Sequence, residues 1–131
     1  MSAFESWFAP VPRSEGLSAI TALVLVTDPR ASVATTLVLQ EMGYAVDLGS
    51  EPTYALRWLR HTRYDVVMLG GPEVATARFA ERIRTAAPDS RIIMMASSDL
   101  PSREMERLQV EVLAPPVDVN MLVERLAPSE F

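Results

Sequence analysis

The chain contains no cysteine and no lysine, and all twelve of its basic residues are arginine. Without cysteine, disulfides, thiolate metal sites and cysteine nucleophiles are excluded. Without lysine, the sequence also excludes mechanisms that need a lysine Schiff base, a P-loop lysine or a lysine salt bridge. These two absences together exclude several classes of enzyme.

Long apolar runs are also missing. The longest uncharged apolar stretch, residues 17–26, contains Ser18 and Thr21 and is too short to span a bilayer. The first residues include Glu5 and two prolines and lack the basic and apolar regions of a signal peptide. We therefore expect a cytoplasmic protein without membrane insertion. The net charge of −5 argues against nucleic acid as a partner of this domain, because phosphate binding needs concentrated positive charge.

A length of 131 residues corresponds to about one domain, and 49% hydrophobic with 22% charged residues is typical of a soluble globular protein. We divide the chain into an N-terminal arm (1–18), a domain (19–127) and a C-terminal tail (128–131). Residues 127–129 would suit the start of a linker to an output domain in a longer regulator.

The arm holds Phe4, Trp7 and Phe8, three of the nine aromatic residues, followed by a connector with prolines and glycine. Two interpretations stay open. The arm is a disordered tail, as chain ends often are, or its aromatics, spaced i, i+3, i+4, dock on this domain or on a partner.

From Thr21 onward, short apolar runs alternate with helical patterns. The predicted strands are residues 22–26, 45–48, 65–69, 91–95 and 110–113. Asp28 or Ser32 is a candidate cap for the first helix, which should stop at Gly43. The later helices are predicted from residue 52, over 74–87, over a short piece at 102–108, and along a final stripe at 119–126. Such alternation predicts a parallel sheet with helices on both faces.

The helical periodicity also predicts which side chains face the core. In the first helix, Leu39 falls off the predicted apolar face and should be exposed. The predicted core residues of the helices are Ala34, Leu37, Val38, Met42, Ala55, Leu56, Leu59, Phe79, Ala80, Ile83, Val119, Leu122, Val123 and Leu126.

The central stretch is residues 64–72, with the sequence YDVVMLGGP. Four apolar residues, 66–69, are typical of a strand buried on both faces, and Gly70-Gly71-Pro72 indicates a tight turn after it. In parallel sheets chemistry is placed at the carboxyl ends of the strands. Here that position is glycine, which offers no reactive side chain.

Six short motifs in this order resemble a response-regulator receiver domain over about residues 20–127. They are Gly43-Tyr44-Ala45-Val46, Ala55-Leu56 with Leu59, Asp65 to Leu69, Ile83-Arg84, Ile92 to Met95, and Leu113-Ala114-Pro115-Pro116-Val117-Asp118. The resemblance implies a flavodoxin-like (βα)5 three-layer α/β sandwich, with strand order 2-1-3-4-5. The fourth helix is expected to be short or irregular.

The family's phosphorylation site needs an acidic pair that holds magnesium, an acceptor aspartate, a hydroxyl and a lysine. The resemblance places these functions at Thr27 and Asp28, Gly70, Ala96 and Pro115. Only Asp28 keeps the required side chain, although Ser97 or Ser98 could supply the hydroxyl if the alignment shifts. The match therefore implies a degenerate pseudo-receiver that lacks the phosphoacceptor and the lysine.

Asp28 alone is a poor magnesium site. We therefore expect no metal, no cofactor and no enzymatic activity. The loops after residues 70 and 96 are shorter than the family's, and the position of its switch aromatic is Val112. The surface that receivers change on phosphorylation should therefore be remodelled.

The hypothesis for function is a phosphorylation-independent module for protein–protein interaction or dimerisation in bacterial signal transduction, with a signalling protein or a second copy as partner. Its candidate interaction surface is Phe4, Trp7, Phe8, Tyr54, Trp58, Met105 and Met121. The alternative is a nucleotide sensor that uses the emptied pocket at the carboxyl edge, with Asp28, Gly70 and nearby arginines around it. An enzyme of another flavodoxin-like family is a third possibility without a visible catalytic constellation.

His61 is the only histidine and lies near a predicted helix end among Arg57, Arg60 and Arg63. For His61, a solvated side chain at a helix end is favoured over a catalytic role. For the three arginines, a solvated basic helix face is favoured over an anion site for a nucleotide or phosphoprotein. Gly70-Gly71 lacks the surrounding glycine pattern of a phosphate-binding loop and is explained by a tight turn.

Overall fold

A computed structural model describes residues 20–49, 51–96, 100–114 and 119–126. The predictions that concern Phe4, Trp7, Phe8, Ser97, Ser98, Pro115, the arm (1–18) and the tail (128–131) lie outside the described residues.

Five parallel strands form one sheet in the order β2-β1-β3-β4-β5, which confirms the predicted topology. The strands are β1 (Thr21–Val26), β2 (Ala45–Leu48), β3 (Val66–Gly70), β4 (Arg91–Met95) and β5 (Val110–Leu113). The predicted bounds of β2, β4 and β5 are confirmed, whereas β1 begins one residue earlier than predicted and β3 is shifted by one residue.

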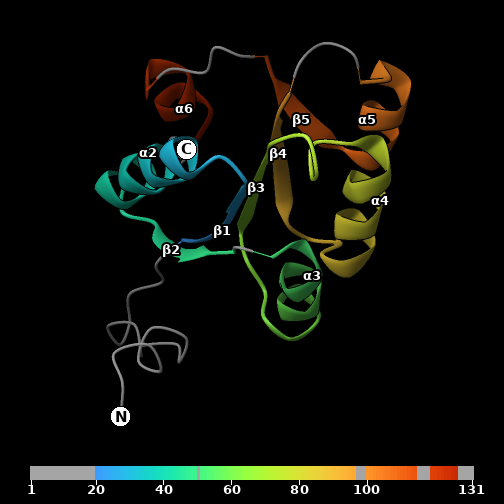
Figure 1. Ribbon diagram of the computed structural model, residues 1–131, viewed down its shortest axis with the longest axis horizontal. Helices are drawn as coiled ribbons and strands as arrows, with labels where there is room; N and C mark the ends of the chain where they lie inside the picture. Colours follow the sequence, from blue (N-terminus) through green and yellow to red (C-terminus); the bar gives the residue numbers. More distant parts are fainter. Residues whose placement is uncertain (1–19, 50, 97–99, 115–118, 127–131) are drawn as a thin grey trace.

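A helix follows each strand, and the helices cover both faces of the sheet (Figure 1). They are α2 (Pro29–Glu41), α3 (Pro52–His61), α4 (Ala77–Ala86), α5 (Ser102–Leu108) and α6 (Val119–Leu126). Figure 1 shows α2 and α6 on one face of the sheet and α3, α4 and α5 on the other. The architecture is therefore the flavodoxin-like three-layer sandwich, and the helix before β5 is short, as expected. None of the described helices is long and apolar enough to cross a membrane.

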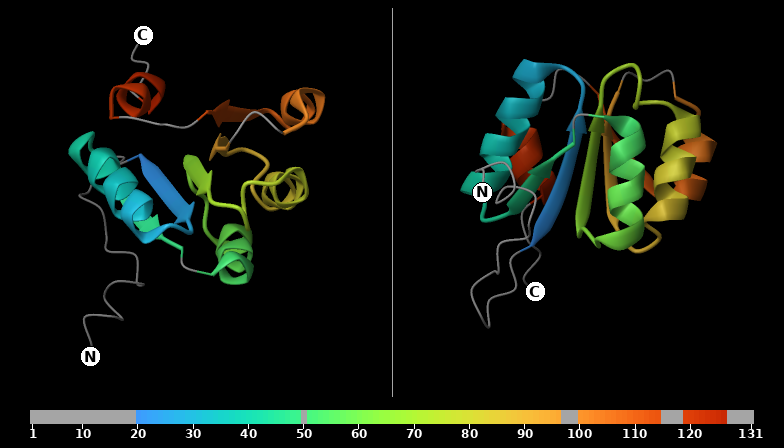
Figure 2. Two further views of the ribbon diagram at one scale, coloured as in Figure 1. Left: turned by 45° about the horizontal axis from the view of Figure 1, so that its top comes forward. Right: turned by 60° about the horizontal axis from the view of Figure 1, so that its bottom comes forward.

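The core consists of two apolar layers, one on each side of the sheet. All five residues of β3 are buried because helices cover both of its faces, as Figure 2 shows from two further directions. The register pairs Val26 of β1 with Gly70 and Gly70 with Met95 of β4. The carboxyl ends of the three central strands therefore lie side by side.

Local capping explains where the first helices begin and end. The Asp28 carboxylate accepts a hydrogen bond from the Ala31 amide at 2.9 Å, and Pro29 occupies the first turn. Gly43, with φ of 94°, terminates α2 in the left-handed conformation. For α4, the prediction that the helix starts at about residue 74 is wrong: Thr76 caps α4, and Val74 is buried in the preceding turn.

The predicted core face of α2 is only partly right: Val38 and Met42 pack against the core as predicted, but the other two predicted residues do not. Leu39, expected to be exposed, is fully buried, whereas Leu37 is 56% exposed and Ala34 is also exposed. The buried face is centred on Thr35 and Leu39, which stand four residues apart. Because the buried Thr35 is polar, the pattern of apolar residues indicated a different face of the helix as the core face.

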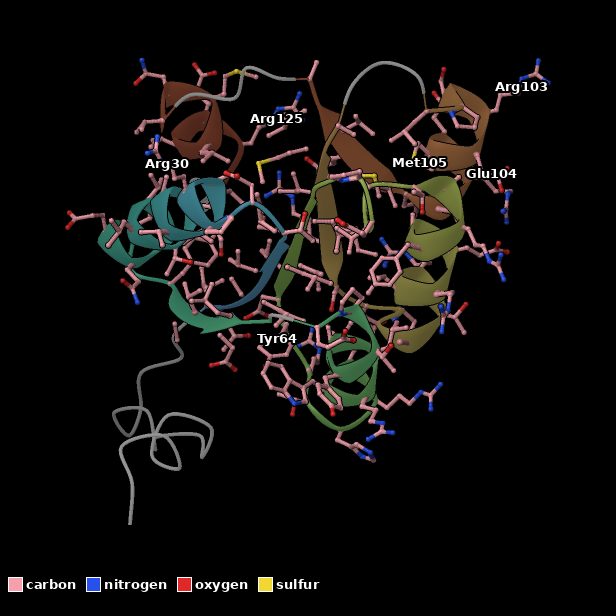
Figure 3. All side chains as sticks on the ribbon, in the orientation of Figure 1. Arg30, Tyr64, Arg103, Glu104, Met105 and Arg125 are labelled. Carbon is pink, nitrogen blue, oxygen red and sulfur yellow. The ribbon has the colours of Figure 1, made fainter. Side chains whose placement is uncertain are left out.

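Two further expectations about exposure need correction. Met105 was a candidate surface residue, but it is only 4% exposed, and Figure 3 shows it on the sheet-facing side of α5. Val119 and Val123 of α6 were expected in the core but are 57% and 40% exposed. Only Leu122 and Leu126 of that helix are buried.

Polar contacts between different strand–helix units gather at the amino-terminal edge of the sheet. The Asp65 carboxylate accepts hydrogen bonds from the Thr21 amide and hydroxyl, at 2.9 and 3.1 Å. The Tyr64 hydroxyl donates to Asp47, and the buried Ser90 hydroxyl donates to the Tyr64 carbonyl. Tyr64 lies at the lower end of the sheet in Figure 3.

The same edge carries an ion-pair network between β4, β5 and α6. Arg91 forms a bidentate pair with Glu111, and Arg125 contacts the same carboxylate at 3.4 Å. The hydrogen bond from Arg91 lowers the pKa of the Glu111 carboxyl. The Tyr44 hydroxyl donates to the Leu126 carbonyl at 2.6 Å, and burial raises the pKa of this phenol.

Candidate functional site

The carboxyl ends of β1, β3 and β4 bring most of the predicted site positions together. Thr27 and Asp28 follow β1, Gly70 ends β3, and Ala96 follows β4. The Thr27 amide donates to the Gly70 carbonyl at 3.0 Å, which joins the first two loops directly. Four of the five predicted positions therefore lie at one edge, and the fifth, Pro115, lies outside the described residues.

Apolar groups surround the position of Gly70. A Cβ atom at Gly70 would lie 3.2 Å from Cε of Met95 and 3.3 and 3.4 Å from the two methyl groups of Val26. A side chain here would thus emerge between a methionine and a valine. None of the three atoms nearest to this Cβ position is charged.

Gly71 is required by the turn itself. Its φ is 108°, and a Cβ atom there would lie 1.8 Å from Oγ1 of Thr27. Its carbonyl accepts hydrogen bonds from the Val74 and Ala75 amides, at 3.2 and 2.8 Å. The predicted tight turn is confirmed from Gly71 onward, whereas Gly70 is the last residue of β3.

The donor atoms do not fit a magnesium ion. Mg²⁺ prefers several hard oxygen ligands in octahedral geometry. Asp28 is exposed and uses Oδ2 to cap α2, and Thr27 supplies a hydroxyl where an acidic pair would have its second carboxylate. Within the described ranges, no group of three or more histidine, cysteine or acidic residues could hold a metal.

A groove of about 280 Å³ opens beside this edge, between α2 and α6. Its lining residues are Val26, Asp28, Ala31, Ala34, Thr35, Val38, Gly70, Gly71, Met95, Val119 and Leu122. Asp28 is the only charged residue that the described chain contributes to this lining, and no arginine lines it. The groove is therefore apolar, with one acidic residue at its mouth.

The basic residues of α3 lie elsewhere. Arg60, His61 and Arg63 line a separate hollow of about 270 Å³, together with the turn at Pro88 that leads into β4. His61 is exposed as the last residue of α3, which confirms its expected place at a helix end. Arg57 lies over the Tyr54 ring, 5.7 Å from its centroid. The α3 arginines therefore do not join Asp28 and Gly70 in one site.

Element order, strand order and the convergence of loops at the carboxyl edge define the flavodoxin-like fold, which response-regulator receiver domains share. Neither a protein-family model nor a curated protein matches the sequence. Solved structures do match. A CheY-like receiver domain from Methanospirillum hungatei is 18% identical with a TM-score of 0.71, and the match covers 83% of this chain and 91% of that one.

Two further structures give the same result. The chemotaxis response regulator CheY4 of Vibrio cholerae is 20% identical (TM-score 0.71), with 83% of this chain and 97% of that chain covered. The receiver domain of the sensor histidine kinase PA1611 from Pseudomonas aeruginosa, solved with magnesium, is 22% identical (TM-score 0.68), with 83% and 95% covered. At these identities the likeness establishes the fold.

Sequence reasoning did not predict that apolar side chains surround Gly70. Val26 and Met95 were assigned only to strands, although the alternation of side chains along neighbouring strands indicates that both share a face with Gly70. It also did not predict that Val33 and Leu37 of α2 are exposed. The available signal was that apolar residues occur all around this helix, so that some of them must face away from the core.

Proposed function

We propose that this chain is a phosphorylation-independent pseudo-receiver that acts as a protein–protein interaction or dimerisation module in bacterial signal transduction. The observation that carries the proposal is the environment of Gly70. The residue that ends β3 has no side chain, and the atoms closest to its Cβ position are methyl groups of Val26 and Met95.

Electrostatics support the loss of phosphotransfer. A phosphoryl group adds about −1.5 to −2 charges near neutral pH, and those charges need cationic partners. The chain has no lysine, and its carboxyl-edge groove has no described arginine. Placing an anion against valine and methionine would carry a desolvation cost without a compensating pair.

An exposed apolar face supports the interaction role. Four of the five large apolar side chains that are exposed in the described residues belong to two neighbouring helices: Val33 and Leu37 of α2, and Val119 and Val123 of α6. Their spacing of four residues places each pair on one side of its helix. We assign the partner or second copy to this α2/α6 face, in place of the surface that included the buried Met105.

Incubation with acetyl phosphate and Mg²⁺ tests the first half of the proposal. Intact-mass measurement should show no added phosphoryl group, because neither an acceptor at position 70 nor a cationic pair is present. A receiver domain with an intact site, treated in parallel, should gain the mass of one phosphoryl group. A stable adduct on an aspartate of this chain would refute the proposal.

A matched pair of surface variants tests the second half. Leu37→Asp should weaken self-association measured by light scattering across a concentration series, since a charge at the centre of the α2/α6 face disfavours its burial. Tyr54→Asp on α3 is the control, because Tyr54 is equally exposed at 56% but lies on the other side of the sheet. Equal effects of the two variants would contradict the assignment to this face.

A further inference from the structure

We propose that the aromatic segment of the N-terminal arm, residues 4–8, docks its side chains into the groove between α2 and α6 of its own domain. The proposal is independent of phosphorylation and assigns an occupant to the apolar groove beside Gly70. The arm would cover Val119 at the groove and leave Val33, Leu37 and Val123, which do not line it, to the partner proposed above. Phe4, Trp7 and Phe8 are the side chains that would enter it.

The groove has the chemistry of an aromatic-binding site. Except for Asp28 and Thr35, the residues that line it are apolar or glycine. Val119 is 57% exposed at its rim, and Ala34 is exposed on the facing helix. Figure 1 shows these two helices side by side on the same face of the sheet. An aromatic side chain buries about 150–250 Å², so covering this groove would remove apolar surface from water on both sides.

The composition of the groove favours apolar side chains over a charged soluble ligand. The groove measures about 280 Å³ and is open to solvent. The lack of an arginine among its described lining residues also disfavours nucleotide phosphates. One or two aromatic side chains match both its volume and its apolar lining.

The arm starts on the correct side and is long enough. Ile20, the first described residue, packs against the core layer that β1 shares with α2 and α6. The chain between Phe8 and Ile20 spans up to about 40 Å when extended. A strand of the length of β1 covers only about 20 Å. The arm is therefore long enough to pass over the helices that cover this face (Figure 1), from the amino edge of the sheet to the groove at its carboxyl edge.

Covalent attachment favours docking within one chain over docking on a second copy. A short flexible linker gives an effective concentration in the millimolar range, which exceeds the protein concentrations of ordinary solution experiments. Three of the nine aromatic residues stand in the first eight positions. Docking within the chain would remove these aromatic side chains from water, whereas a fully solvated tail would leave them exposed.

The environment of Trp7 tests the proposal in the full chain. A Trp58→Phe variant leaves Trp7 as the single tryptophan. Its fluorescence should be blue-shifted and shielded from acrylamide. Adding Val119→Asp at the groove rim should raise the quenching constant severalfold and shift the emission to the red. Val33→Asp is the matched control, since Val33 is 55% exposed but does not line the groove.

Fluorine NMR of the parent chain labelled with 5-fluorotryptophan provides a second measurement that needs no change at Trp58. The Trp7 resonance should move on Val119→Asp and stay in place on Val33→Asp. Full solvent access of Trp7 in the parent, or equal responses to the two variants, would overturn the proposal. Shielding that disappears on dilution, together with a dimer in light scattering, would also overturn it and would place the arm on a second copy.

Discussion

Replacement of Arg84 by alanine is expected to lower the free energy of unfolding by about 3 kcal/mol. The Arg84 guanidinium donates to five backbone carbonyls: Leu108 at 2.8 Å, Ser90 at 2.8 Å, Pro88 at 3.1 Å, Gln109 at 3.1 Å and Ala87 at 3.2 Å. It thereby joins the end of α4 to the start of β4 and to the turn before β5. Hydrogen bonds to a charged group contribute more than neutral ones, and partly buried carbonyls would lose their partner.

Chemical denaturation monitored by circular dichroism measures this loss. Arg82→Ala is the control, because Arg82 is exposed on the same helix and should change stability by less than about 0.5 kcal/mol. Arg84→Lys should fall between the two, since one ammonium group cannot replace the fork of donors that contacts five carbonyls. Similar stabilities for the alanine variants at positions 82 and 84 would contradict the assigned role.

Replacement of Gly71 by alanine is expected to have the second large effect. The left-handed backbone costs an L-residue about 1–2 kcal/mol. In addition, the new methyl group would lie 1.8 Å from Oγ1 of Thr27, so that the turn or the end of β1 would have to move. We expect the two contributions together to exceed about 3 kcal/mol, with overpacking accounting for the additional part.

Gly43→Ala separates the two contributions. Gly43 also has positive φ, at 94°, but its Cβ position has no heavy atom within 4 Å. This variant should therefore show the backbone cost alone, and the difference from Gly71→Ala measures the steric conflict. Combining Gly71→Ala with Thr27→Gly should restore most of that difference, as a double-mutant cycle by thermal unfolding would show. Equal losses at positions 43 and 71 would refute the conflict with Thr27.

The strands could be predicted from the sequence because they depend on local signals, whereas their order was implied by the resemblance to receiver domains. Val66 to Leu69 form an apolar run that ends at two glycines, and the burial of all of β3 follows from helices on both faces. Asp28 and Gly43 marked the ends of α2 through capping. The fold class then followed from the alternation of strands and helices.

Side-chain details that depend on distant residues could not be predicted in this way. Thr35 is buried at the centre of α2, so a polarity pattern placed Leu37 inside and Leu39 outside, the reverse of their positions. The helical pattern of α4 gave no sign that Arg84 reaches the carbonyls of Leu108 and Gln109, more than twenty residues away. Such contacts are set by the tertiary arrangement and have no local signature.

The candidate site was predictable in position but not in character. The resemblance to receiver domains singled out Thr27, Gly70 and Ala96, and the carboxyl ends of parallel strands bring these positions to one edge. Val26 and Met95 approach Gly70 only through the register of three paired strands. The assignment of a pseudo-receiver function remains a prediction, to be decided by the phosphorylation and light-scattering experiments.

The polar contacts at the amino edge make this chain suited to loop grafting. Three sets of contacts join neighbouring strand–helix units at the edge opposite the turns after β1 and β3. They are Thr21 with Asp65, Arg91 with Glu111, and Arg84 with its backbone carbonyls. An engineer could therefore replace the exposed Pro72 and Glu73 by a binding segment while keeping the buried Val74 and these contacts unchanged. The framework would then carry a designed recognition surface at the carboxyl end of the sheet.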